Sequence, residues 1–77
     1  MPPAPYDQLY IYEVLGDARQ AASGLVNDYL GLWLEDDTSF LFFAAPAPAQ
    51  VEAVLAQDPG LRLREVHHLT YEQWQGG

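Results

Sequence analysis

The chain has 77 residues, of which 49% are hydrophobic and 13% aromatic, so it forms one small domain and is too apolar for a disordered tail. Eleven acidic residues against three arginines and no lysine give a net charge of −8, which excludes binding to nucleic-acid phosphates and to anionic membranes. The absence of cysteine excludes disulfides, thiolate metal sites and a cysteine nucleophile. The acidic composition has two explanations. From charge alone, solubility comes first, and the functional alternative is that the chain binds a basic protein partner.

The ends of the chain differ in composition from its middle. Residues 1–8 are rich in proline, so we expect a disordered start. We expect the folded domain over residues 9–69 and a linker toward a missing C-terminal domain over residues 70–77. No apolar run approaches the roughly 20 residues that a membrane span requires, and the first residues carry no signal segment, so we expect a cytoplasmic protein.

The first part of the domain predicts a strand and a helix. Residues 9–15 are β-branched and aromatic and apolar on both faces, which is typical of a central strand. Asp17 is a candidate N-cap, and Gln20 completes a variant of the capping box. Apolar residues recur at helical spacing over residues 18–29, although Gly24 weakens such a helix by about 1 kcal/mol relative to alanine.

A hairpin is predicted in the middle of the chain. Residues 30–35 alternate, with leucines on one face and Trp33 on the other. Asp36 and Asp37 supply turn chemistry, because their short side chains bond to their own backbone. Residues 39–45 follow as a strongly apolar strand, which completes the hairpin.

A second helix and a last strand end the domain. Pro48 suits the first turn of a helix, where its missing N–H is not needed, and residues 58–60 end that helix. The apolar stripe of the helix consists of Val51, Val54 and Leu55. Residues 61–68 alternate as the last strand. The side chains that we expect to matter for folding are Leu25, Phe42, Val54 and Leu55.

The element order predicts the fold class. A strand, helix, strand, strand, helix and strand close into an α+β, two-layer ferredoxin-like sandwich with both helices on one face of an antiparallel sheet. Right-handed crossovers place the first and third strands in the middle. The other sheet face stays open, and an aromatic open face is typical of a contact surface. The candidates for that face are Gly31 and Trp33 with one of two alternating pairs, Tyr10 with Tyr12 or Leu9 with Ile11.

Aromatic residues are also the candidate partner-binding residues. Tyr71 and Trp74 stand three residues apart, on one side of a short helical turn, and have little to pack against so near the end. The full candidate set is Trp33, Tyr10, Tyr12, Tyr71 and Trp74.

Metal binding is not predicted. His67 and His68 point to opposite faces of a strand, so they cannot ligate one ion. Glu65 shares a face with His67, but no third ligand is evident in the sequence.

Catalysis is not predicted either. The carboxylates of residues 35–37 lie at a hairpin tip, where solvent keeps all of them ionised. Ser23 and Ser39 lack the glycines of a nucleophile elbow, and Gly16 stands alone where a phosphate loop would need more glycines. We therefore expect no catalytic residue and no cofactor site in this chain.

Two segments carry a resemblance to a known family. Residues 31–35 (Gly-Leu-Trp-Leu-Glu) and the aromatic strand 40–46, closed by Ala-Pro, resemble the N-terminal domain of the ribosomal protein L-eleven methyltransferase family. Residues 71–74 are similar to the segment that leads from that domain toward the catalytic part. The resemblance covers roughly residues 9–74.

The resemblance implies a division of labour. The chain would be a non-catalytic recognition domain, monomeric or weakly dimeric, that positions a basic ribosomal protein for a separate S-adenosylmethionine-dependent domain. The main alternative is a stand-alone ferredoxin-like regulatory module that dimerises and binds a small ligand or a protein, and a small enzyme is the third. Size in solution separates the first two, because a sensing module should be a dimer.

Overall fold

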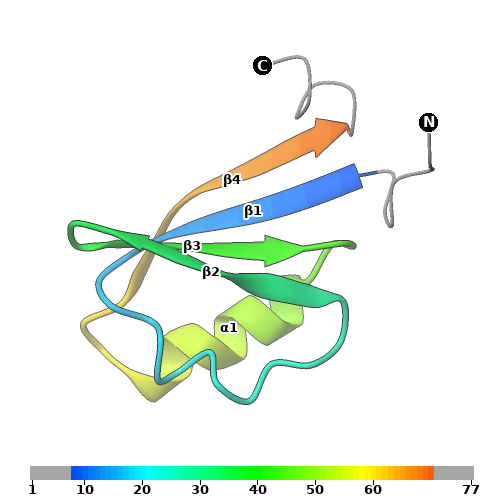
Figure 1. The fold of residues 1–77 in the computed structure, drawn as a ribbon. Coiled ribbons are helices and arrows are strands. Elements are labelled where there is room, and N and C mark those ends of the chain that lie inside the picture. Colours follow the sequence, from blue (N-terminus) through cyan, green and yellow to red (C-terminus); the bar gives the residue numbers. More distant parts are fainter. Residues whose placement is uncertain (1–7, 71–77) are drawn as a thin grey trace.

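The computed structural model describes residues 8–70, which form a four-stranded antiparallel sheet with one helix against one face (Figure 1). The elements are β1 (Gln8–Leu15), β2 (Tyr29–Glu35), β3 (Thr38–Phe43), α1 (Pro48–Gln57) and β4 (Arg62–Thr70). The strand order is β2-β3-β1-β4, so β1 and β3 lie in the middle, as predicted. The α+β class and the antiparallel sheet are likewise confirmed.

The hydrophobic core lies between the sheet and α1. Alternate residues of the two central strands face the helix, which contributes Val51 and Val54. The rings of Tyr12 and Phe43 meet edge to face, with centroids 5.5 Å apart. Pro48 stands in the first turn of α1, as the sequence predicts.

The predicted first helix is wrong. Residues 17–28 form turns and irregular backbone, on the same side of the sheet as α1. Ala18 and Ala22 are buried and joined by one backbone hydrogen bond, but Val26 is 78% exposed. A short helix depends on burying an amphipathic face, and alanines bury little area there, while Gly24 weakens the segment further.

A buried serine anchors this segment in place of helical packing. The hydroxyl of Ser39 donates a hydrogen bond to the carbonyl oxygen of Gly16 at 2.6 Å and accepts one from the backbone N–H of Ala18 at 2.8 Å. Ser39 lies on β3 and is fully buried. The chain after β1 is therefore tied to the sheet by side-chain hydrogen bonds rather than by a helix.

Asp17 does not cap a helix. Its carboxylate accepts hydrogen bonds from the backbone N–H of Arg19 at 3.0 Å and from the Arg19 guanidinium at 2.6 Å. These bonds lower the pKa of Asp17 and raise the pKa of Arg19. The predicted N-cap is instead part of a local turn that is closed by an ion pair.

The four residues expected to matter for folding differ in how deeply they are buried and in the sheet face on which they lie. Val54 is 1% exposed and belongs to the core, whereas Leu25 and Leu55 are partly buried against it. Phe42 is half-buried on the sheet face opposite α1, and the neighbouring Phe43 is the one that fills the core. Phe42 therefore packs on the face that α1 does not cover, and its expected importance for folding stays a prediction.

Residues 1–7 and 71–77 lie outside the described part of the chain, so the expected proline-rich start and linker fall almost wholly outside it. Within residues 8–70, no helix is both long enough and apolar enough to cross a membrane.

Candidate partner-binding site

The sheet face opposite α1, called the open face below, is defined by the strand register. Residues that pair directly on antiparallel strands present their side chains on the same face. One row across the sheet consists of Trp33, Phe40, Glu13 and Glu65. The adjacent row consists of Gly31, Phe42, Ile11 and His67. The open face is therefore aromatic over β2 and β3, and over β1 and β4 it carries Glu13, Glu65 and His67 beside the apolar Ile11.

The aromatic half is dominated by Trp33. Its side chain is 61% exposed, and its indole N–H donates a hydrogen bond to the carboxylate of Glu35 at 3.3 Å. A Cβ atom added at Gly31 would meet nothing within 4 Å, so the surface is open beside the indole. Ile11, which lies on the same face of the sheet, is 7% exposed and is therefore buried.

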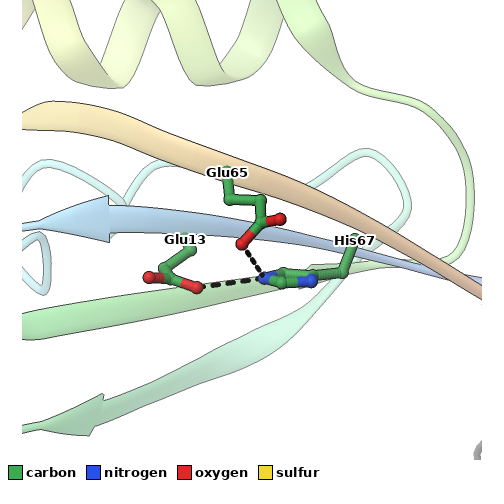
Figure 2. Close-up of side chains that lie close together, drawn as sticks. All are labelled: Glu13, Glu65 and His67. Carbon is green, nitrogen blue, oxygen red and sulfur yellow. Dashed lines mark hydrogen bonds and ion pairs between the residues drawn. The ribbon is translucent and has the colours of Figure 1, made fainter.

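The charged half is a compact network on β1 and β4 (Figure 2). The Nε2 atom of His67 lies 3.0 Å from a carboxylate oxygen of Glu13 and 3.6 Å from one of Glu65. The Nε atom of Arg64 forms an ion pair with the other oxygen of Glu13 at 3.2 Å. Because the Glu13 side chain is 13% exposed, this carboxylate is the best shielded from water of the four groups.

The third ligand that the sequence did not reveal is Glu13. Glu65 and His67 share a face, as predicted, and the pairing of β1 with β4 brings Glu13 opposite Glu65. The donor atoms of the three side chains all lie within 4.8 Å of one another, so they could hold a divalent cation. The predicted strand order puts β1, which carries Glu13, next to β4. The pairing register that sets Glu13 opposite Glu65 cannot be predicted from the sequence of either strand alone. As it stands, the cluster is an ion-pair network in which Arg64 already supplies a cation.

The second histidine is placed apart from this cluster. His68 stacks on Tyr10 with ring centroids 4.3 Å apart, and its Nε2 lies 2.7 Å from the side-chain oxygen of Gln8. Tyr10 packs against the helix-facing core, so the two adjacent histidines do point to opposite faces.

The predicted partner-binding residues are not brought together. Trp33 lies on the open face with Leu9 and Ile11, which settles the two alternatives left by the sequence. Tyr12 is 5% exposed in the core, where its hydroxyl accepts a hydrogen bond from the backbone N–H of Ala47 at 3.0 Å. Tyr10 is half-buried on the same side as Tyr12. Neither tyrosine can share one surface with Trp33, and the candidates at positions 71 and 74 lie outside the described residues.

The serine hydroxyls considered for catalysis are hydrogen-bonded to backbone groups, and the carboxylates are exposed at a turn. Ser39 is fully buried and bonded to backbone, and Ser23 donates to the carbonyl oxygen of Gln20 at 2.8 Å. Residues 35–37 are exposed at the hairpin turn, as predicted. Between residues 8 and 70, these groups form no pair of a nucleophile and a base.

Comparison of the chain with family models, curated proteins and solved structures finds no match.

Proposed function

We propose that the chain is a non-catalytic recognition domain that binds a basic protein segment on the open face of its sheet. The observation that carries this proposal is the row of Trp33, Phe40, Glu13 and Glu65. It sets a largely exposed indole beside an aromatic ring and two carboxylates, in a molecule of net charge −8.

The chemistry of this row suits a cationic side chain. An exposed tryptophan is costly in water and is the residue type most often found to dominate binding energy at interfaces. An arginine or lysine of a partner can lie over the indole and be attracted by its π face. The exposed carboxylate of Glu35 lies on the same face and adds charge complementarity, and the negative charge of the molecule speeds encounter with a basic protein.

The resemblance of the sequence supplies a specific version of the proposal. In it, the domain belongs to a ribosomal-protein methyltransferase, the fold is a ferredoxin-like sandwich whose first helix has been replaced by turns, and the partner is a basic ribosomal protein of the stalk base. The methyl donor, S-adenosylmethionine, would bind to a separate domain.

The test is a calorimetric titration of the domain with that purified ribosomal protein at several salt concentrations. We expect saturable binding that weakens with salt, and a loss of affinity of about 30-fold in Trp33→Ala, which corresponds to a hot-spot residue. Val26→Ala is the matched control, because Val26 is exposed on the opposite side of the molecule, in the segment beside α1. Binding that is equally tight in Trp33→Ala and in the unaltered domain would contradict the proposal.

A further inference from the structure

We infer that the basic segment binds by adding a strand to the outer edge of β2. This inference rests on the proposed function and states how that partner is held. An extended peptide that joins a sheet edge gains main-chain hydrogen bonds, and its alternate side chains then lie on the face beside the edge. For β2, that face carries Trp33.

Among the described residues, no strand pairs with the outer edge of β2. β2 ends the sheet, and within residues 8–70 its strand hydrogen bonds run only to β3. Residues 29–34 contain neither a charged residue nor a proline, and Leu30 is 44% exposed. The register shift of β2 lies at its start, between Tyr29 and Gly31, so residues 31–35 continue in regular pairing. An uncharged apolar edge of this kind is a template for another strand.

The opposite edge of the sheet is protected. β4 carries Arg62, Arg64 and Glu65, all of them exposed, along its first half. A register shift interrupts its pairing with β1 between Glu13 and Val14. Charges and bulges on an edge strand are the devices by which proteins prevent unwanted pairing. Over residues 62–65, β4 is therefore guarded by charges that β2 lacks between residues 29 and 34.

The acidic residues at both ends of β2 determine the occupant. Asp28 precedes the strand, and Glu35, Asp36 and Asp37 end it. In the symmetric antiparallel register centred on Leu32, a second copy of the chain would set its Asp36 against Asp28. A parallel copy sets each carboxylate beside its own counterpart, and like charges directly opposite destabilise a strand pair. The fitting occupant is an extended segment with basic residues at both ends and apolar residues between them.

A synthetic peptide of this pattern is the probe: acetyl-Lys-Lys-Val-Thr-Val-Thr-Val-Lys-Lys-amide. Amide hydrogen exchange of the isotope-labelled domain is measured with and without the peptide. We expect exchange of the outward-facing amides of residues 30–34 to slow by about ten-fold or more at saturation, with no change in β4. The same peptide with N-methyl groups on alternate residues is the control, because it loses main-chain donors but keeps its charge. Equal binding of the N-methylated peptide would overturn the inference.

The contribution of the acidic ends is tested with the double variant Asp28→Asn and Asp36→Asn. Both positions have positive φ angles, 59° and 55°, and asparagine adopts this backbone as readily as aspartate, so the fold is retained. We expect the affinity for the peptide to fall by about ten-fold, against no change in Glu52→Gln on the exposed side of α1.

The outcomes separate the inference from the proposed function. Trp33-dependent binding of the ribosomal protein without protection of β2 amides would refute strand addition and leave recognition by the open face standing. The absence of both Trp33-dependent binding and protection of the β2 amides would refute strand addition and the proposed function together. Peptide binding that the double variant does not weaken would contradict the charge argument for the occupant.

Discussion

The hydroxyl of Tyr12 shows how a single buried polar group connects two elements. It accepts the hydrogen bond of the Ala47 backbone N–H at the start of α1, where alanine offers no capping side chain. Tyr12→Phe leaves that buried N–H without a partner, and we expect it to lower the free energy of unfolding by about 1–3 kcal/mol in urea denaturation. Tyr10→Phe is the matched control and should change stability by less than about 0.5 kcal/mol, since its hydroxyl donates a hydrogen bond to the exposed side chain of Gln8.

Tyr29 gives the domain a dependence on alkaline pH. Burial raises the pKa of its phenol, because the charged phenolate is poorly solvated there. The contribution of Tyr29 to folding stability is fully present below the ordinary tyrosine pKa of about 10. It is lost as the pH rises through the higher pKa that Tyr29 has in the folded state. We expect the thermal midpoint of unfolding to decrease as the pH is raised above about 10, and to decrease less steeply in Tyr29→Phe. Identical pH profiles of the variant and the unaltered domain would show that Tyr29 does not contribute.

At the scale of elements, α1 is the part whose packing is most easily tested. Val54 is 1% exposed in the core, and Val26 is 78% exposed in the segment before β2. Val54→Ala removes buried methyl groups and should cost about 2 kcal/mol of unfolding free energy. The same substitution at Val26 should cost less than about 0.5 kcal/mol. Equal costs at the two positions would mean that α1 does not pack on the sheet through Val54.

The elements that could be predicted from the sequence are those with strong local signals. The hairpin turn at Asp36 and Asp37, the start of α1 at Pro48 and the apolar strand β1 all form as expected. The segment over residues 17–28 has helical spacing too, but three of its apolar residues are alanines, which bury little area. The bonds from Ser39 that hold this segment join residues more than 20 positions apart, and no local pattern reveals them.

The candidate site was predictable only in part, for the same reason. Alternation along β2 placed Trp33 on the open face, and alternation along β4 separated His67 from His68. Which residues of β1 join Trp33 depended on the face that α1 covers, so the sequence left two pairs open. The position of Glu13 opposite Glu65 depends on a register that forms only when distant strands pair.

At the scale of the whole molecule, the net charge of −8 must affect stability as well as binding. Residues 8–70 pair only a few of the carboxylates with arginine or histidine, through Asp17, Glu13 and Glu65. The remaining like charges repel one another, and salt screens this repulsion over about 10 Å at 0.1 M. We therefore expect the thermal midpoint to rise between low salt and about 0.2 M sodium chloride. A fall over this range would mean that the ion pairs outweigh the repulsion.

The indole N–H of Trp33 reports directly on recognition of a basic partner through the open face. The measurement is a titration of the isotope-labelled domain with the basic ribosomal protein, followed by the indole resonances at low and at moderate salt. Trp74→Phe leaves Trp33 as the one indole in the chain. We expect the Trp33 resonance to move with saturation, together with amides of β2 and β3, and added salt to reverse the change. Saturable binding that moves only resonances of α1 and residues 17–28, with Trp33 unchanged, would contradict recognition through the open face.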